Sequence, residues 1–107
     1  NIIDGIMHDD FTIEFADKIF DCVDKGFEEK ENVDVVIRPE DIEIVSQDKG
    51  QWSGVIQSVT FKGVHYEMIA KSDDYNWMIH STIMKPEGTK IGMKVIPENI
   101  HVMKKVR

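Results

Sequence analysis

The sequence predicts an all-β fold, and three observations lead to that prediction. Apolar and polar residues alternate with a period of two along most of the 107 residues, as expected of strands with one buried face. Turn-forming residues interrupt this alternation at short intervals. Apolar residues nowhere keep a period of 3.6 over a dozen positions, so we expect no helix longer than a single turn at a Pro-Glu corner.

Each half of the chain supplies four of the expected strands. In the first half they are bounded by turns and by one polar loop: 6–8, 11–15, 18–23 and 33–38. In the second half they follow one another after short reversals: 52–62, 65–71, 75–79 and 91–96. The pairs Asp9-Asp10 and Asp73-Asp74 are typical of turns, and Gly63 permits a tight reversal.

The parity of the apolar residues predicts which side chains share a face of these strands. Val55, Val59 and Phe61 share one parity and are expected together on one face of their strand. Tyr75, Trp77 and Ile79 are expected on one face of the strand that follows the Asp73-Asp74 turn.

A short phrase occurs twice, as VIRPEDIEI around Pro39 and as KVIPENIHV around Pro97. The residue before a proline is driven into an extended conformation, the proline fixes its own φ, and the Asp or Asn that follows Glu supports a tight turn. Each copy is therefore predicted to be a strand, a one-turn corner and a strand. We expect 33–45 and 91–103 to have equivalent backbones, although such corners also recur by chance in β proteins.

The repeat suggests two similar β units in one small domain. Their expected bounds are about 1–45 and 52–107, with the polar segment 46–51 as a linker. Many short strands in a chain of this size favour a small barrel or sandwich, for which the OB-fold is the natural match. Because Asn1 opens the chain inside an apparent strand, we expect a piece of a longer protein.

The charge distribution narrows the class of partner. The formal net charge is −7, with 14 acidic and 4 basic side chains in 1–45 and 6 acidic and 9 basic side chains in 46–107. Nucleic-acid binding needs clustered Lys and Arg, so this balance argues against it. The single cysteine, Cys22, has no partner for an internal disulfide, which suits a reducing compartment. No apolar run reaches the roughly 20 residues that a membrane span requires.

The sequence contains no pattern of a catalytic centre. It has neither a phosphate-binding loop nor a dinucleotide-binding glycine motif, so the chain itself is expected not to bind or hydrolyse Mg-ATP. We expect no catalytic residue, no metal site and no cofactor, and the sequence identifies no ligand-binding residue. Five side chains of types that bind zinc are scattered along the sequence: His8, His65, His80, His101 and Cys22. Of these, His65 and His80 could face each other across neighbouring strands. Four aromatic residues are of the type that stacks bases in OB-folds: Phe61, Tyr66, Tyr75 and Trp77. The basic groove that should accompany them is missing from the sequence.

Three segments resemble the transport-associated OB domain, or TOBE domain, of ATP-binding subunits of bacterial ABC importers. They are the IRPED run from Ile37 to Asp41, the segment from Gly54 to Gly63 with the pattern G-x-I-x-x-V-x-F-x-G, and the final run from Gly92 to Ile100. The opening IIDGIMHDDF and the later FDCVDKGF are most similar to the spermidine/putrescine branch. The resemblance covers essentially the whole chain.

The resemblance implies a role for the longer protein and for this part of it. An N-terminal ATPase domain, absent here, would bind and hydrolyse Mg-ATP. The parent subunit would form a homodimer under membrane permease subunits, at the cytoplasmic face of the bacterial plasma membrane. Residues 1–107 would be its regulatory and interaction domain, with no enzymatic activity of their own.

The first corner is the candidate regulatory or interface site, formed by Arg38, Pro39, Glu40 and Asp41. A guanidinium can make a bidentate pair with a carboxylate of a neighbouring unit or subunit. The alternative is that Arg38 pairs locally with Glu40 or a strand carboxylate. The second copy of the phrase has Ile96 in place of the arginine.

Three other functions compete with this one. The acidic half could bind polyamine directly, which would make the chain a ligand-sensing module. An OB-type binder of single-stranded nucleic acid is disfavoured by charge. An oxyanion-binding module, like related domains of molybdate systems, would need a nest of Lys and Ser that the sequence does not make evident.

Overall fold

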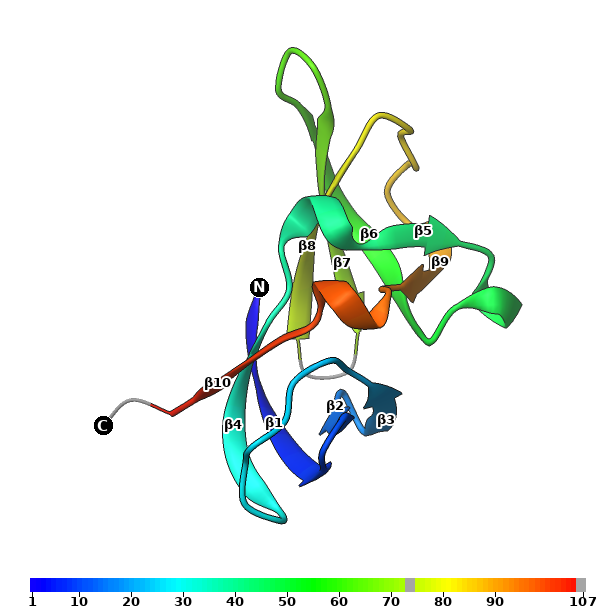
Figure 1. Ribbon diagram of the computed structural model, residues 1–107. Helices are drawn as coiled ribbons and strands as arrows, with labels where there is room; N and C mark the ends of the chain where they lie inside the picture. The colour runs from blue at the N-terminus through cyan, green and yellow to red at the C-terminus, as the bar shows by residue number, and fades with distance from the viewer. Residues whose placement is uncertain (73–74, 106–107) are drawn as a thin grey trace. The chain divides into compact units, whose positions relative to one another are not determined.

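The computed structural model describes residues 1–72 and 75–105, and these residues form strands, turns and 3-10 helices without an α-helix (Figure 1). The first antiparallel sheet has five strands in the order β10 (His101–Lys104), β4 (Glu31–Val36), β1 (Ile2–Asp9), β2 (Thr12–Phe15) and β3 (Lys18–Asp21). The second has the order β5 (Glu43–Val45), β9 (Lys90–Lys94), β6 (Trp52–Phe61), β7 (Tyr66–Ser72) and β8 (Tyr75–Ser81). The predicted all-β class is confirmed. The expected turn at Asp73-Asp74 lies outside the described residues.

The chain divides into two compact units whose bounds differ from those expected. Unit 1 combines residues 1–37 with the segment that starts at Ile96, and unit 2 is Arg38–Val95. The reason is that β10 pairs with β4, whereas β5 pairs with β9. Each unit therefore contains strands from both halves of the sequence, which a division at 46–51 does not allow.

Unit 1 has a core formed by one face of its sheet. The alternation of buried positions along its strands follows the pleat, and Phe15 and Phe20 stack with ring centroids 4.0 Å apart. The buried apolar side chains of this unit come from all five strands and the adjoining loops: Met7, Ile13, Phe15, Phe20, Cys22, Val33, Val35, Ile37, Ile100 and Val102.

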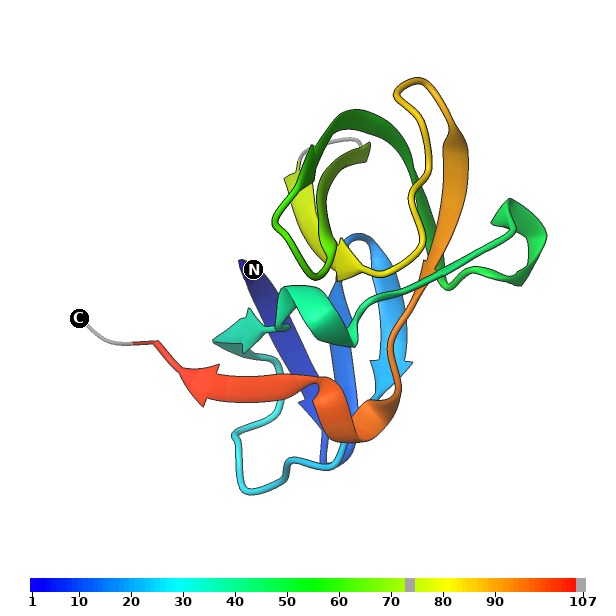
Figure 2. The same ribbon diagram turned by 90° about the horizontal axis from the view of Figure 1, so that it is seen from above.

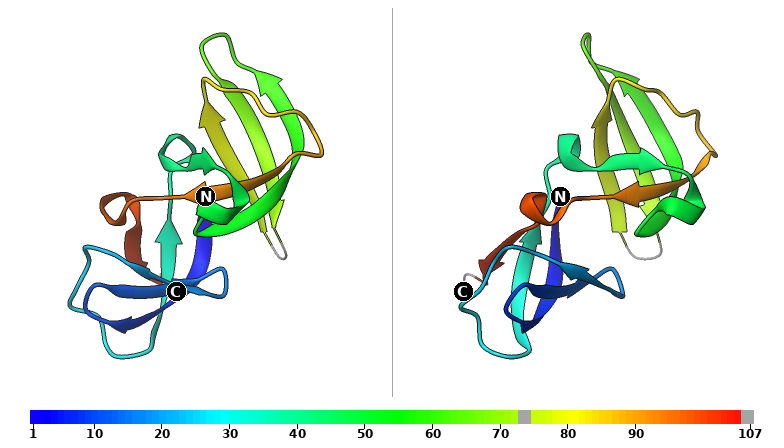
Figure 3. Two further views of the ribbon diagram at one scale, coloured as in Figure 1. Left: turned by 90° about the vertical axis from the view of Figure 1, so that its right-hand side faces the viewer. Right: turned by 45° about the vertical axis from the view of Figure 1, so that its right-hand side comes forward.

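Unit 2 is a strongly curled sheet. Figures 2 and 3 show β6 and β7 bending along their length, so that the sheet wraps around its own core. The first corner, η1 (Pro39–Asp41), precedes the edge strand β5 and also contacts β8, the opposite edge. The corner thus covers an edge that would otherwise offer unpaired backbone groups.

The core of unit 2 contains both tryptophans, Trp52 and Trp77, whose ring centroids lie 4.9 Å apart. Trp77 is fully buried and its indole N–H donates to Ser72 Oγ at 2.9 Å. The buried side chains of this unit are mostly aliphatic: Ile42, Trp52, Ile56, Met68, Ala70, Trp77, Ile79, Ile91, Met93 and Val95. The expected shared face of Trp77 and Ile79 is confirmed.

The face predicted for β6 does not form the core. Trp52, Gly54 and Ile56 are buried, whereas Val55 is 38% and Phe61 is 59% exposed. The pairing of β6 with β7 is irregular between Ile56 and Ser58, and such a bulge shifts the alternation of faces within one strand. A constant parity along 52–62 therefore could not hold.

The two copies of the repeated phrase have equivalent backbones, as predicted. Each is a strand, a 3-10 turn and a strand: β4–η1–β5 and β9–η3–β10, with η3 at Pro97–Asn99. Arg38 (φ −71°, ψ 145°) and Ile96 (φ −77°, ψ 151°) are both extended before their prolines. Asp41 N–H donates to the Arg38 carbonyl at 3.0 Å, and Asn99 N–H donates to the Ile96 carbonyl at 3.0 Å. The equivalence therefore extends to the hydrogen bond that closes each turn.

The segment 46–51 is packed against a strand and is not a linker. It contains a third 3-10 turn, η2 (Gln47–Lys49), which no Pro-Glu corner predicts. Gln51 N–H donates to the Met93 carbonyl at 2.8 Å. A Cβ added at Gly92 of β9 would collide with the Ser46 carbonyl and lie 3.0 Å from Gly50 Cα. The missing side chain at Gly92 is what lets this segment cross β9.

Cys22 is buried beside β3 and is 4% exposed. Its burial raises the pKa of the thiol above the ordinary value of 9.0, and the charges of Asp24 and Asp21 add to this effect. A raised pKa keeps the thiol protonated and weakly nucleophilic. Cys22 is thus a buried thiol with little reactivity.

We expect Gly92→Ala to lower the free energy of unfolding by about 1–3 kcal/mol, because the obstructing atoms are backbone and cannot turn aside. Denaturant unfolding measures this change. Gly63→Ala is the control, since Gly63 has a φ of +93° and no atom within 4 Å of an added Cβ. Its cost is backbone strain alone, about 1 kcal/mol. Equal costs at the two positions would contradict the proposed crossing of β9.

We also expect Cys22→Ala to change how stability depends on pH. The folded-state pKa of Cys22 is raised, so the stability that the neutral thiol contributes is complete below the unfolded pKa and is lost as pH rises through the folded pKa. The difference in unfolding free energy between wild type and Cys22→Ala should therefore shrink from pH 8 to pH values above about 9. Parallel stability curves for the two proteins across this range would rule out a buried titrating thiol.

Candidate functional site

The predicted corner site contains a local ion pair. Arg38 Nε donates to Asp41 Oδ2 at 2.7 Å, across the single turn of η1. This contact raises the pKa of the Arg38 guanidinium above its ordinary value, with the hydrogen bond that Arg38 donates to Asp41 as the main cause and the nearby charge of Glu40 as a smaller one. The local partner is thus Asp41, and neither Glu40 nor a strand carboxylate.

The pair leaves most of the guanidinium on the surface. The Arg38 side chain is 58% exposed, while that of Asp41 is only 12% exposed. Because a guanidinium has five N–H donors, the bond from Nε leaves its terminal nitrogens able to approach a further carboxylate. The second corner has Ile96 and Asn99 at the matching positions, so the charged pair distinguishes the two copies.

Unit 1 carries an acidic hollow, which the sequence did not identify. Its volume is about 480 Å³. Residues of β1, β2, β4, the turn after β2 and the position after β10 line it: Asp4, Gly5, Ile6, Glu14, Phe15, Ala16, Asp17, Asn32 and Lys105. The Lys105 ammonium bridges Asp4 Oδ1 at 2.5 Å and Asp34 Oδ1 at 2.9 Å. These two hydrogen bonds raise the pKa of Lys105. A primary amine on a four-carbon chain therefore already rests on two carboxylates of different strands.

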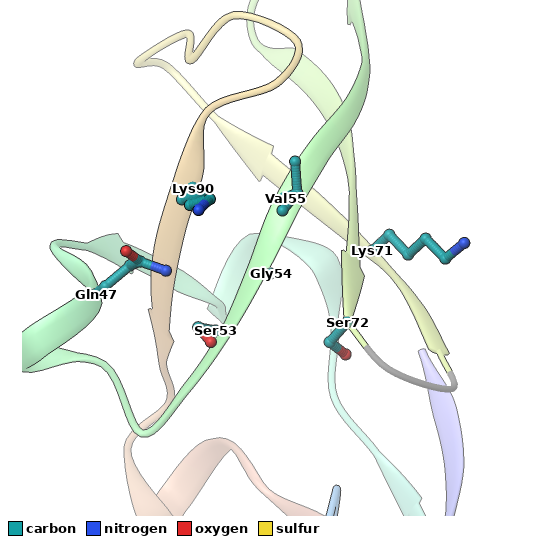
Figure 4. Close-up of a pocket in the computed structure, with 7 residues that line it drawn as sticks. All are labelled: Gln47, Ser53, Gly54, Val55, Lys71, Ser72 and Lys90. Carbon is teal, nitrogen blue, oxygen red and sulfur yellow. The ribbon is translucent and has the colours of Figure 1, made fainter.

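Unit 2 carries a lysine hollow of about 420 Å³, shown in Figure 4. It is lined by residues of η2, β6, β7 and β9: Gln47, Ser53, Gly54, Val55, Lys71, Ser72 and Lys90. Two lysines and two serines are among its lining residues, and none of the seven is acidic. This is the Lys and Ser combination that the sequence did not make evident. Only the pairing of the strands brings these distant positions together.

The two histidines that could face each other do so. The ring centroids of His65 and His80 lie 4.5 Å apart, and His80 Nε2 is 3.2 Å from Glu67 Oε1. Among the described residues, no three His, Cys, Asp or Glu side chains come together in an arrangement that could hold a metal ion.

The four aromatic residues do not form one open stacking surface. Trp77 is fully buried, and the edge of its indole packs against Tyr75 with centroids 4.7 Å apart. Phe61 is exposed but pairs with Tyr66, with centroids 5.1 Å apart.

The described residues also contain no helix long and apolar enough to cross a membrane.

Comparison with known proteins gives relatives that share most of this chain. It is 58% identical over 106 residues to the spermidine/putrescine import ATP-binding protein PotA of Clostridium novyi, covering 99% of this chain and 30% of that protein. It is 51% identical over 107 residues to the protein of the same name from Desulfitobacterium hafniense, covering 31% of that protein. The chain therefore spans about 30% of the length of the curated relatives that it matches.

A solved structure shares the fold at low sequence identity. The cytoplasmic molybdate-binding protein ModG, with molybdate bound, superposes with a TM-score of 0.73 and 11% identity, covering 98% of this chain and 96% of that chain. This likeness supports the OB-like fold.

The sequence pattern of the TOBE domain matches residues 35–103, a segment that contains both corners. The chain therefore belongs to the TOBE domain family.

Proposed function

We propose that this chain is the non-catalytic regulatory and interaction domain of the ATP-binding subunit of a polyamine importer of the ABC type. The observation that carries the proposal is the 58% identity over 99% of the chain to a spermidine/putrescine import ATP-binding protein. The match extends over 106 of the 107 residues, so it spans both corners and the strands between them. The chain adds no catalytic motif of its own.

In this proposal the rest of the protein performs the chemistry. An N-terminal domain binds and hydrolyses Mg-ATP, and two copies of the subunit act together on membrane permease subunits. The protein works at the cytoplasmic face of a bacterial plasma membrane. The names of the relatives support these assignments, since each is an import ATP-binding protein.

The corner at Arg38 is the proposed point of contact with a neighbouring subunit. Pro39 fixes the direction in which the chain turns, and Asp41 holds the guanidinium at the surface through a 2.7 Å hydrogen bond. An arginine that is already oriented loses less side-chain entropy when it binds a second carboxylate. The pair with Asp41 then acts as a support for the intersubunit contact.

We expect Arg38→Ala to leave the isolated domain folded, with only a small change in its melting temperature, because the side chain is exposed. In the full transporter the substitution should reduce the coupling of ATP hydrolysis to uptake while the affinity for ATP stays the same. Thermal melts of the domain and paired ATPase and uptake assays of the transporter measure these effects.

Arg38→Lys and Asp41→Asn are the matched controls. The lysine keeps the charge but loses the planar donor set, and the asparagine weakens only the local support. If Arg38→Ala matches wild type in both transporter assays, the corner has no intersubunit role. If the isolated Arg38→Ala domain unfolds, Arg38 is a structural residue instead.

A second candidate function is direct polyamine binding in the acidic hollow. Asp4, Glu14 and Asp17 line it around the apolar side chain of Ile6, and polyamines alternate ammonium groups with methylene segments. The hydrogen bonds that Lys105 donates to Asp4, which lines the hollow, and to Asp34 beside it support this alternative, because carboxylates here already accept from an alkylammonium. In this alternative the chain senses the polyamine that the importer carries.

Calorimetry of the chain with spermidine at physiological salt tests this alternative. We expect Lys105→Met to tighten spermidine binding, since it frees two carboxylates, and Asp4→Asn to weaken it. Lys104→Met is the control, because Lys104 lies beside Lys105 but contacts Glu31. Binding that is only millimolar and disappears at high salt would contradict a specific site.

A further inference from the structure

We propose that the C-terminal end of β6, from Ser58 to Phe61, is a docking edge for an extended segment of a partner protein in which aliphatic residues alternate with acidic ones. This surface is separate from the corner at Arg38 and from the acidic hollow, and its occupant is a peptide strand. The inference follows from the strand ladder, from the apolar face of the β6–β7 hairpin and from the charges beside its edge.

The end of β6 is paired on one side only. β9 pairs with residues 52–55 of β6, and Ile56 then bonds to Gly88 and Thr89, with N–H to carbonyl distances of 2.8 and 2.9 Å. Among the described residues these are the last backbone hydrogen bonds on that side of β6, whereas β7 pairs with β6 as far as Phe61. Figures 1 and 3 show the β6–β7 hairpin projecting past the loop that connects β8 to β9.

The ladder shows which backbone groups face the open side. Lys62 N–H donates to the His65 carbonyl at 2.8 Å and closes the hairpin. Opposite residues of an antiparallel pair alternate between hydrogen-bonded and non-hydrogen-bonded, so Val59 and Phe61 occupy non-hydrogen-bonded positions of the β6–β7 ladder. Their N–H and C=O groups therefore point away from β7, where they form a template for another strand.

The side chains of this edge form an apolar face. Val59 lies opposite Met68, which is fully buried, so Val59 and Phe61 are on the side of the sheet that faces the core of unit 2. The core does not extend to the end of the hairpin. Val59 is only half-buried, and Phe61 is 59% exposed although its ring pairs with that of Tyr66.

The loop between β8 and β9 adds apolar surface beside the hairpin. It leaves β8 after Ser81, which pairs with Tyr66, and Ile83 N–H donates back to Ser81 Oγ at 3.1 Å. Ile83 and the next residue, Met84, are both exposed. An occupant of the β6 edge thus has aliphatic partners on the hairpin and on this loop.

The opposite face of the hairpin is polar and its charges are paired. Glu67 lies opposite Thr60, and its carboxylate oxygens are 3.9 Å from Lys62 Nζ and 3.2 Å from His80 Nε2. The ring of His80 also packs beside that of His65. The hairpin therefore has one face with polar partners and one apolar face in contact with solvent. An exposed apolar face next to an open backbone edge is the combination that strand addition uses.

Lysines stand at both ends of the open edge. Lys62 follows Phe61 directly, and Lys90 lies opposite Val55, where the pairing with β9 ends. Residues 57–61 between them have no charged side chain. An added strand that turns alternate residues toward Phe61 turns the others toward the outer face, where Lys62 and Lys90 lie. Acidic residues at those positions complement the lysines, and this attraction selects the alternating sequence.

The test is a titration of the ¹⁵N-labelled chain with the synthetic peptide Ac-EVEVEVE-NH2, followed by amide chemical shifts and hydrogen exchange. We expect saturable shifts at Val59 and Phe61. The amides of these two residues should exchange quickly in the free chain and about tenfold more slowly with saturating peptide. The amide of Thr60, which faces β7, should be protected with and without peptide.

Two further peptides test the geometry and the charge. In an antiparallel added strand the valines opposite Val59 and Phe61 turn their N–H groups toward β6. N-methylation of the valines should therefore abolish binding, whereas N-methylation of the glutamates should preserve it. The peptide Ac-KVKVKVK-NH2 should bind more weakly than the acidic peptide.

Variants of the chain test the named side chains, each after a check for an intact amide spectrum. Phe61→Ser should weaken binding by about tenfold, because it removes an apolar contact. Val64→Ser is the matched control, since Val64 is 81% exposed at the tip of the same hairpin but lies beyond the paired residues. Lys62→Gln and Lys90→Gln should each weaken binding by about twofold, and Lys94→Gln, at the other end of β9, should have no effect.

The proposal is overturned if the acidic peptide gives no saturable shift, if the valine-methylated or lysine peptide binds as tightly, or if Val64→Ser weakens binding as much as Phe61→Ser. Two other occupants would also overturn it. Dimerisation of the chain that Phe61→Ser abolishes would assign the edge to a second copy. Binding to phosphatidylglycerol vesicles that Val64→Ser abolishes would assign the hairpin tip to a lipid surface.

Discussion

The pairing of the two strand–corner–strand segments is the constraint on which the rest of the structure depends. Val36 lies opposite His101 in one sheet, and Glu43 lies opposite Lys94 in the other. Six residues lie between Val36 and Glu43, and six lie between Lys94 and His101. Both corners therefore use the same length of chain, and the register continues from one sheet to the other without a slip.

This constraint explains why a chain of this size repeats the same phrase. Proline sets the extended residue before it and the tight turn after it, so each corner has a fixed length and direction. A corner one residue longer would shift one ladder by one position and turn its buried face to solvent. The repetition is thus a requirement of geometry, and the side chains on the corners are free to differ.

The corner side chains that do differ are the ones that carry the proposed intersubunit contact. Arg38 and Asp41 form an ion pair on the first corner, whereas Ile96 and Asn99 occupy the second. The two hollows are also surface features, since each lies on a face of its sheet that is turned away from the core of its unit. The lining of the unit 1 hollow contains three carboxylates and one lysine, Lys105, whereas the lining of the unit 2 hollow contains two lysines and no carboxylate.

The sequence by itself determined the local structure: the strands, the turns and the equivalence of the two corners follow from alternation and from proline, which act over a few residues. It also indicated the family, through motifs that include Arg38 and Pro39. Only the tertiary structure decided which strands pair, and so placed the unit boundary at Arg38 instead of within 46–51. It likewise decided the buried face of β6, where a bulge breaks the alternation, and the placing of Lys71 and Lys90 on the two strands that flank Val55. These features depend on contacts between residues far apart in the chain, and a periodic pattern contains no information about which distant strand lies beside it.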